Sequence, residues 1–298
     1  MTLTTPNADV RETFELTEAP DIGAREVEPA ALVQLPTARP APHPGRRRSR
    51  FRGSQRLLGV VALVAAWELA SAVGVLHPQE LAAPTAVLST GAHLVANGTL
   101  ESALWASLQR VFWGLVIGVP AGAALALASG LSRTGENLID GNVQMLRFVP
   151  IIGLESLFVL WLGVGQTAKV AMITLGVVFP IYINTYAAIR TIDPAFHELA
   201  TVIGLTRWGR VRRVVLPAAL PGFLVGLRLA VAVAWLLLVF AEQINASSGL
   251  GYLIVEAQTY FQSNVIVVCL ACYAVLGLLT DVLVRRMESV CLRWQPGR

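Results

Sequence analysis

Residues 197–217 read HELATVIGLTRWGRVRRVVLP, and this stretch lies between two long apolar runs. It is too polar to cross the hydrocarbon layer of a bilayer, because four arginines fall within seven residues, at positions 207, 210, 212 and 213. Its apolar residues nevertheless recur at helical spacing. The pattern indicates an ordered, amphipathic insert between two membrane spans.

The first half of the insert has the signals of a short helix. Asp193 and Pro194, just upstream, have the pattern of a helix N-cap followed by proline at the first helical position. Apolar residues then fall at i, i+3, i+4 and i+7 on one face, namely Phe196, Leu199, Ala200 and Ile203. Gly204 follows, and glycine lets the chain turn beyond a helix C-terminus.

The second half has the pattern of another short helix. Thr206 is a suitable N-cap, with Trp208, Val211 and Val215 on one side and arginines elsewhere. The pair Leu216-Pro217 is expected to end this helix before the chain re-enters the membrane. Periodicity alone leaves two interpretations open: an interfacial helix pair that only anchors the topology, or a docking site for another protein.

The rest of the chain is dominated by apolar segments. Of its 298 residues, 55% are hydrophobic and only 14% are charged, which is a membrane-protein composition. Six apolar segments cover about 57–76, 103–128, 149–164, 170–188, 222–241 and 265–284. They lack the strict alternation of barrel strands. The sequence therefore predicts an all-α polytopic membrane protein with six transmembrane helices.

The N-terminal region has a different composition. Residues 1–54 are rich in Pro, Ala, Thr and Glu and have no periodic apolar positions, which predicts a disordered tail. No apolar core follows the first methionine, so this is not read as a secretory signal. The predicted membrane domain is residues 55–298, with residues 190–217 as its polar insert.

Arginine and lysine are distributed unevenly between alternate connections. They are abundant before the first segment, in the 190–217 insert and after the last segment, whereas residues 77–102 and 245–264 have none. Lys169, the only lysine, is the exception on the poor side. The positive-inside rule then places both termini and the insert in the cytoplasm.

The insert resembles the EAA loop of ABC-importer permeases. The matching positions are Glu198-Leu199-Ala200, Gly204, Val214 and Leu216-Pro217, at the spacing of that loop, with Leu199 as a departure where alanine is usual. Five further stretches resemble the aliphatic sulfonate permeases and their taurine and nitrate relatives: LWLGVGQTAKV, FPIYINTYAAIRTID, LPAALPGFLVGLRLAVAVAWLLLVFAE, SSGLGYLI and LRWQP. The resemblance extends over about residues 55–295.

This resemblance implies a type I ABC importer permease in a bacterial inner membrane. It implies two copies of this chain (a homodimer), two copies of a cytoplasmic ABC ATPase subunit, and an extracytoplasmic substrate-binding protein. The cargo implied is a small oxyanion, an aliphatic sulfonate in the first place, with taurine, nitrate or bicarbonate as alternatives. The residues carried over to ATPase coupling are Glu198, Ala200, Gly204, Leu216 and Pro217.

The residues themselves give no sign of an enzyme. The chain has no G-x-x-x-x-G-K-[ST] phosphate-binding loop, so ATP hydrolysis would require a partner. Its histidines are scattered, its three cysteines fit no zinc spacing, and no nucleic-acid motif accompanies its arginines. No catalytic, cofactor or metal residues are predicted. The alternatives from other classes are a secondary transporter driven by an ion gradient and a membrane anchor without transport.

Ionisable groups within membrane segments are candidates for a functional role. Arg110 fits a sulfonate in fork geometry or snorkels to the outer interface, and snorkelling is the favoured interpretation. Glu155 lies within GLESL, where the sulfonate relatives tend to have Pro-Leu. This departure either tunes the translocation path or weakens the assignment to sulfonate. Glu68 is read as a helix–helix hydrogen-bonding group. Glu242 lies at the outer end of the fifth segment.

A glycine-containing loop follows Glu242. Gly249 and Gly251 permit an irregular backbone, which is tolerated at membrane depth only against protein or a water-filled cavity. The loop is either part of the outer end of the path or an ordinary turn, and residues 252–262 are expected to form a short helix. The predicted path residues are Glu155, Arg110, Glu242, Gly249 and Gly251.

Overall fold

The computed structural model describes residues 51–77, 80–244 and 246–294. Within these ranges the chain consists of α-helices with short π and 3₁₀ turns and contains no strand, which confirms the all-α prediction. Ser54–Arg298 forms one compact unit. Residues 1–50 of the predicted disordered tail lie outside the described residues, whereas residues 51–54 are not disordered, because they form the start of α1 (Phe51–Ala72).

Among the described residues, four helices are long and apolar enough to cross a membrane. They are α3 (Thr99–Leu131), α7 (Gln166–Arg190), the continuous stretch Arg207–Gln243 that includes α10 (Leu216–Gln243), and α12 (Ser263–Cys291). They contain the second, fourth, fifth and sixth predicted segments. The first predicted segment, about 57–76, is helical only as far as Ala72, the last residue of α1 (Phe51–Ala72), and the apolar part of this helix, Val61–Ala72, is shorter than the others.

The third predicted segment is not a straight span. Its helix α6 (Glu155–Leu162) has eight residues, which is too short to cross about 30 Å of hydrocarbon. Pro150 has an extended backbone and is followed by the 3₁₀ turn η2 (Ile151–Leu154). Proline restricts the residue before it and offers no N–H, so the upstream helix, which ends at Leu146, cannot continue through this position. Arg133–Leu146 and Ile151–Leu162 meet at 89° and form either a broken span or a re-entrant loop.

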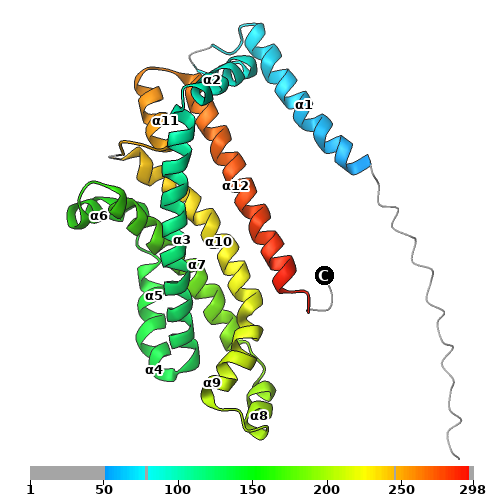
Figure 1. Ribbon diagram of the computed structural model, residues 1–298, viewed down its shortest axis with the longest axis vertical. Helices are drawn as coiled ribbons and strands as arrows, with labels where there is room; N and C mark the ends of the chain where they lie inside the picture. Colours follow the sequence, from blue (N-terminus) through cyan, green and yellow to red (C-terminus); the bar gives the residue numbers. More distant parts are fainter. Residues whose placement is uncertain (1–50, 78–79, 245, 295–298) are drawn as a thin grey trace, which may run out of the picture. The chain divides into compact units, whose positions relative to one another are not determined.

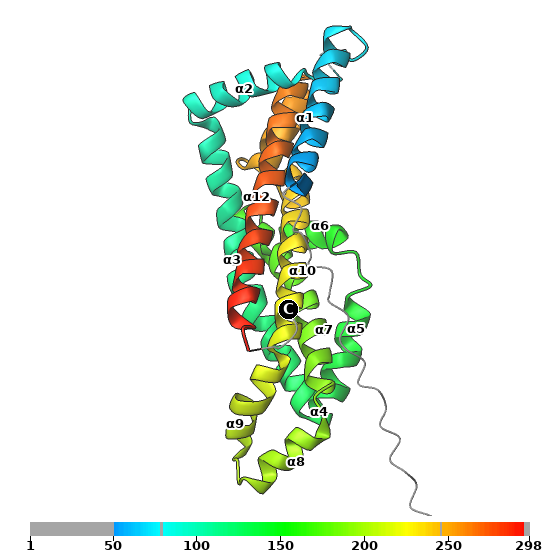
Figure 2. The ribbon, with the colours of Figure 1, turned by 90° about the vertical axis from the view of Figure 1, so that its right-hand side faces the viewer.

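Helix α7 lies at the centre, packed against α3 on one side and α10 on the other (Figures 1 and 2). Glycines of α3 allow close approach to α7: a Cβ at Gly118 would lie 2.7 Å from the Val177 side chain and 2.9 Å from the Thr174 carbonyl oxygen. Gly122 meets Ile181 in the same way, one turn further along. Small residues at a helix interface let two backbones approach, which favours dispersion contacts where lipid provides no hydrophobic drive.

Polar contacts join α7 to the helices that follow α3. Those helices are α4 (Arg133–Gly135), the π turn η1 (Glu136–Asp140) and α5 (Gly141–Leu146). The Tyr182 hydroxyl donates to Asp140 at 2.9 Å, and the Tyr186 hydroxyl donates to Glu136 at 2.9 Å. The two tyrosine rings are stacked with centroids 5.6 Å apart. These bonds fix η1 against the same end of α7 that leads into the polar insert.

The two ends of the bundle carry different short helices (Figure 1). At one end lie α8 (Pro194–Val202) and α9 (Arg207–Arg210), which form the insert. At the other end lie α2 (Pro84–Ala96), which was not predicted, and α11 (Leu250–Thr259), which confirms the short helix expected at 252–262. Both α2 and α11 pack against α12.

Candidate functional site

The insert begins with the predicted cap. The Asp193 carboxylate accepts a hydrogen bond from the Ala195 backbone N–H at 2.9 Å, and Pro194 occupies the first helical position. The helix ends at Val202, and Gly204 follows the C-cap residue with a φ of +71°, a conformation that residues with a side chain rarely adopt. The Leu205 N–H then donates to the Ala200 carbonyl at 2.9 Å, closing the last turn.

The second half of the insert corrects one prediction. Thr206 caps α9 as expected, accepting from the Gly209 N–H at 3.1 Å. However, Leu216-Pro217 does not end the helix, because α9 runs through the π turn η3 (Val211–Val215) directly into α10. A π turn is wider than an α turn, which accommodates a proline ring that would otherwise clash with the carbonyl four residues earlier, at Arg213.

The apolar face of α8 is mostly uncovered. Ala200 is 1% exposed, whereas Phe196 and Leu199 are each 56% exposed and Ile203 is 62% exposed. Glu198 is also exposed, but it lies on the opposite side of the helix from this apolar stripe, about 200° around the axis from Phe196. Exposed large apolar residues grouped on one short helix indicate a surface that another molecule covers.

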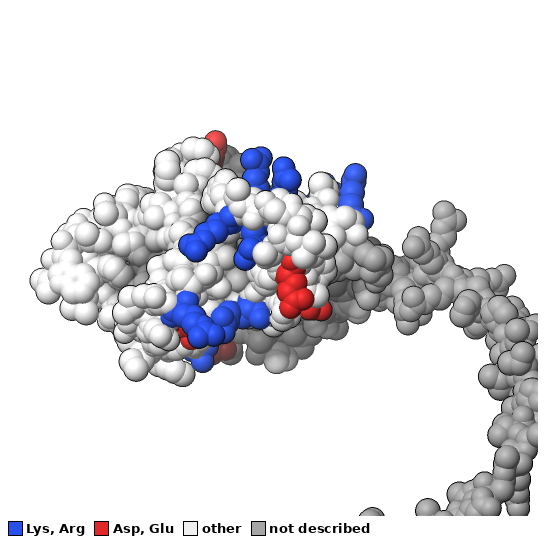
Figure 3. All heavy atoms as spheres, turned by 90° about the horizontal axis from the view of Figure 1, so that it is seen from below, with Lys and Arg blue, Asp and Glu red and all other residues white. Residues whose placement is uncertain are grey.

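The two remaining positions predicted for ATPase coupling, Leu216 and Pro217, lie where the insert joins the bundle. Leu216 and Pro217 are both exposed at the start of α10. Basic side chains outnumber acidic ones on the surface at this end (Figure 3). A hollow of about 570 Å³ lies beside the turn, and its lining includes Gly204, Thr206, Trp208, Arg212 and Arg213. The surface at this end is therefore partly apolar and strongly basic.

A buried ion pair lies near the opposite end of α10. Arg110 of α3 is 2% exposed and Glu242 of α10 is 1% exposed, and their side chains form a salt bridge. Arg110 also donates to the Ser248 carbonyl at 2.8 Å, the Ser248 hydroxyl at 3.0 Å and the Gln166 side-chain oxygen at 2.5 Å. Every nitrogen of this guanidinium is therefore engaged.

The Glu242 carboxylate is equally well bonded. It accepts from the Ser107 hydroxyl at 2.7 Å and 2.9 Å, from the Gly251 N–H at 2.8 Å, and from the Tyr273 hydroxyl at 3.0 Å. Ser107 in turn accepts from the Leu250 N–H at 3.0 Å. This buried charge cluster, Arg110 and Glu242 with these partners, joins α3, α7, α10, α12 and the start of α11.

The two predicted loop glycines allow this closure. Gly249 has a φ of +114°, and a Cβ there would overlap both Arg110 and Glu242. A Cβ on Gly251 would lie 2.5 Å from the Glu242 Cβ. Both positions therefore require glycine because the loop backbone packs directly against the ion pair.

Replacement of Gly251 tests this packing. Gly251→Ala is expected to destabilise the fold by about 1–3 kcal/mol, because the added methyl group must displace the Glu242 side chain. Gly277→Ala is the matched control: Gly277 lies in α12, and its added methyl group would have no neighbouring atom within 4 Å, so this variant should be neutral or slightly stabilised. The apparent melting temperature in detergent compares them, and equal values would contradict the close packing.

The structure decides between the sequence-based interpretations of these charges. Snorkelling of Arg110 to the interface, the favoured interpretation, is wrong, because the guanidinium is buried and bonded on all sides. Four of the five predicted path residues meet in one cluster.

Sequence reasoning missed Ser107, Gln166 and Tyr273, although Ser107 lies three residues before Arg110 and hence on the same helix face. Glu68 does form the helix–helix contact expected of it, accepting from the Thr85 hydroxyl at 2.9 Å.

Glu155, the fifth predicted path residue, lies outside that cluster. It is 6% exposed, it begins α6 at the bend of the broken pair, and its Oε2 atom is buried without a hydrogen-bond partner. Lys169 of α7 is 7% exposed, and its ammonium group donates to the Gly165 carbonyl at 3.4 Å. Glu155 is thus a buried carboxylate with unused acceptor capacity.

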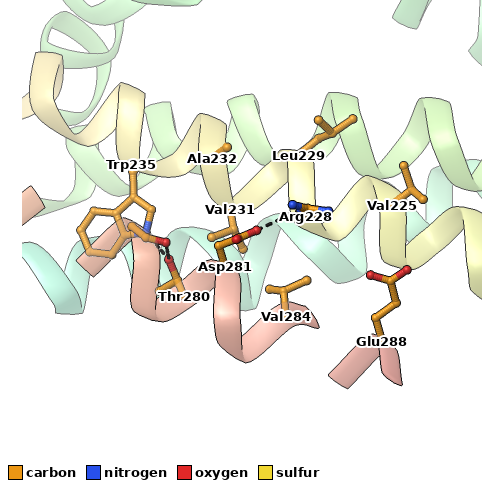
Figure 4. Close-up of a pocket in the computed structure, with 11 residues that line it drawn as sticks. Val225, Arg228, Leu229, Val231, Ala232, Trp235, Thr280, Asp281, Val284 and Glu288 are labelled. Atoms are coloured by element: carbon orange, nitrogen blue, oxygen red, sulfur yellow. Dashed lines mark hydrogen bonds and ion pairs between the residues drawn. The ribbon is translucent and has the colours of Figure 1, made fainter. Parts of the chain in front are cut away.

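A separate cavity of about 710 Å³ lies between α10 and α12 (Figure 4). Arg228 points across it to Asp281, with 2.9 Å between the guanidinium Nε and the carboxylate, and the Trp235 indole donates to the Thr280 hydroxyl at 3.0 Å. Apolar side chains form most of the remaining lining. Arg228 is exposed and shares the Asp281 carboxylate with Arg285, which forms a second salt bridge to it. In the part of the chain that the structure describes, no group of acidic, histidine and cysteine side chains could hold a metal ion.

The arrangement defines a class of protein. Membrane-length helices, with a polar insert continuous with one of them, are the architecture of a helical polytopic membrane protein. The fold is similar to a chain in the crystal structure of an amino acid ABC transporter with histidines, with a TM-score of 0.56, coverage of 66% of this chain and 96% of that chain, and 21% identity.

The sequence places the chain in a family. Residues 118–289 match the family described as binding-protein-dependent transport system inner membrane component, and the chain belongs to this family. It is 44% identical to the putative aliphatic sulfonates transport permease protein SsuC of Escherichia coli (strain K12), covering 80% of this chain and 90% of that protein. It is 36% identical to the protein of the same name from Bacillus subtilis (strain 168), and the match covers 85% of this chain and 91% of that protein. Identity to the taurine transport system permease protein TauC of Escherichia coli (strain K12) is 29%, and the match covers 80% of this chain and 88% of that protein.

The family makes this chain an ABC importer permease, which is a transport subunit and not an enzyme. The prediction of an ABC-importer permease from the sulfonate and taurine group is thereby confirmed.

Proposed function

We propose that this chain is the translocating subunit of an ATP-driven importer for a small oxyanion, and that its principal cargo is an aliphatic sulfonate. Two relatives named for aliphatic sulfonate transport, at 44% and 36% identity over most of their length, support this cargo. The relative named for taurine transport supports a second cargo of the same chemistry. Two copies of the chain form the pathway, below a substrate-binding protein and above two ATPase subunits.

The uncovered face of α8 carries this proposal. Phe196, Leu199 and Ile203 are more than half exposed, and a transport subunit without an ATP-binding loop needs an energy-supplying partner. We assign Glu198 to an ionic contact with the ATPase, and the glycine turn at Gly204 to the angle between the two short helices. Ala200, Leu216 and Pro217 complete the coupling surface.

Helix α10 transmits the motion. From Arg207 to Gln243 the chain is helical for 37 residues, which is roughly 55 Å at the rise of an α-helix. Closure of the ATPase dimer on ATP would displace α8 and α9, and the continuous helix would carry that displacement to Glu242. There the buried charge cluster connects α10 to α3, α7, α11 and α12, so the outer ends of these helices move together. Hydrolysis reverses the displacement, which is alternating access.

The predicted path residues divide into two kinds. Arg110, Glu242, Gly249 and Gly251 form the outer joint, since their polar atoms already have protein partners. Glu155 faces the path. Residues 1–54 form a cytoplasmic tail outside the permease domain of residues 55–298, and both termini are cytoplasmic, in agreement with the distribution of arginine.

Co-purification tests this function. The tagged chain, extracted from its native membrane in mild detergent, is expected to bring with it an ATPase that contains a phosphate-binding loop, identified by mass spectrometry. The complex, with its binding protein, should import aliphatic sulfonates into liposomes only when ATP is enclosed. Recovery of the chain alone, under conditions that preserve other ABC complexes, would contradict the coupling role and favour a transporter driven by an ion gradient.

A further inference from the structure

The broken helix pair carries a long exposed bend. Residues 145–164, called here the bent arm, run from the last two residues of α5 through η2 and α6 towards the start of α7. Within its own chain the arm packs mainly against α7. Its large apolar side chains with an exposed fraction of at least 40% are eight: Met145, Leu146, Phe148, Ile152, Leu160, Trp161, Leu162 and Val164.

The bent arm lies at membrane depth. Gln166, two residues beyond the arm, accepts a hydrogen bond from Arg110. Arg110 is the twelfth residue of α3, which places it roughly 16 Å from the Thr99 end of that helix at the rise of an α-helix. Figures 1 and 2 both show α6 beside the middle of the bundle, away from either end. The arm is therefore within the hydrocarbon layer that the long helices cross.

Lipid alone cannot cover this arm. Pro150 has an extended backbone, Gly163 has a φ of +80°, and both residues are exposed. Irregular backbone at this depth occurs only where it is buried in protein or lines a water-filled cavity, because lipid offers its polar groups no hydrogen bond. The exposed faces of α3 and α12 have no such requirement, since a regular helix satisfies its own backbone. The bent arm therefore needs a protein neighbour.

The surface of the arm suits a second copy of the same chain. At roughly 100 Å² for each of the eight exposed apolar side chains, it offers about 800 Å², which is what one partner contributes to a standard interface. A two-fold contact sets a surface against itself, so exposed charges there would repel each other. From Phe148 to Val164 the only ionisable side chain is Glu155, which is 6% exposed. Two arms can therefore meet without repulsion.

We propose that the bent arms of two copies pack against each other at mid-membrane, and that each arm covers the irregular backbone of the other. This inference rests on the proposed function, which requires two copies and leaves open where they meet. Among the partners proposed there, a second permease copy is the one that lies within the bilayer. The side of the pathway at Glu155, the first residue of α6, is then complete only when the partner's arm closes it.

Cross-linking through introduced cysteines tests this contact. The arm variants are Leu160→Cys, Phe148→Cys and the two combined, at positions that are each 76% exposed. They are made in a background that retains its ATPase and lacks the native thiols, through Cys269→Ala, Cys272→Ala and Cys291→Ser. A thiol reagent that reaches about 10 Å, the spacing of packed helices, is added to native membranes. A cross-linked dimer should be the main product of the combined variant, which also captures a contact between unlike positions.

Leu278→Cys is the matched control. Leu278 is an apolar residue of α12 that is 64% exposed on a straight helix, so its cross-linked dimer should remain a minor product. No dimer from any arm variant, or more dimer from Leu278→Cys than from the arm, would overturn the proposal. If an arm substitution instead prevented the second copy from joining, while the chain kept its melting temperature, that loss would support the contact.

Native mass spectrometry of the unmodified complex separates this inference from the proposed function. Two copies of the chain in the complex, without cross-links between arms, would refute the arm contact and leave the two-copy importer intact. A single copy in each complex would contradict the two-copy pathway itself, and the arm contact with it.

Discussion

Glu198→Arg is expected to abolish association with the ATPase and, with it, transport. Glu198 is exposed on α8, so the substitution replaces its negative charge by a positive one at an end of the bundle where basic side chains already predominate (Figure 3). A like charge at a protein interface costs several kcal/mol, which is about a thousandfold in affinity. The measurement is the amount of ATPase retained when the tagged permease is purified from membranes.

The matched control is Glu256→Arg. Glu256 is an exposed glutamate of α11, at the opposite end of the bundle, and the substitution makes the same change of charge. This variant should retain the ATPase. If Glu198→Arg assembled and transported as the wild type does, the assignment of Glu198 would be wrong, and the arginines of residues 207–213 would become the primary candidates for the contact.

Arg110→Met is expected to have the largest effect on stability. It leaves Glu242 buried at 1% exposure without its counter-ion, and breaking one side of a buried ion pair costs about 3–5 kcal/mol. The apparent melting temperature of the purified permease should fall by roughly 10 °C. Since Arg110 also holds Ser248 and Gln166, the loop before α11 should become more accessible to protease.

A second variant separates the charge from the packing. Arg110→Met combined with Glu242→Met removes both charges, and replacement of a whole buried pair by apolar groups is often nearly neutral. The double variant should therefore be more stable than Arg110→Met alone, although Ser107 and Tyr273 lose an acceptor. A loss of stability in the double variant equal to the sum of the losses in Arg110→Met and Glu242→Met would contradict a direct pairing of the two side chains. Restored stability with lost transport would agree with a role of the pair in joining helix movements.

The polar insert could be predicted from sequence because its signals are local. Asp193, Gly204 and Thr206 each act on backbone groups within three residues, so the caps and the turn follow from spacing alone. The end of the second helix could not be predicted in this way. Proline normally disfavours a continuing helix, and only the π turn before Pro217 makes continuation possible.

The charged groups were harder to assign because their partners are distant in sequence. Arg110 and Glu242 are 132 positions apart, and the guanidinium of an isolated helix would extend to the interface. Which helix faces meet depends on the glycines of α3 that fit against α7, and hydropathy does not reveal the pairing. The bend at Pro150 had a visible signal, the proline itself. Residues 149–164 were nevertheless predicted to be a straight span because they form an apolar run.

The π turn at Val211–Val215 has a geometric consequence for the importer. A wide turn takes in one residue more than an α turn, and one residue corresponds to about 100° around the axis of the helix. The side chains of α9 are therefore turned by about that angle from where an unbroken helix would place them relative to α10. The direction in which the arginines of α9 point is therefore not tied to the direction in which Glu242 points by a regular α-helical repeat. The π turn fixes the rotation between the two ends of this continuous helix.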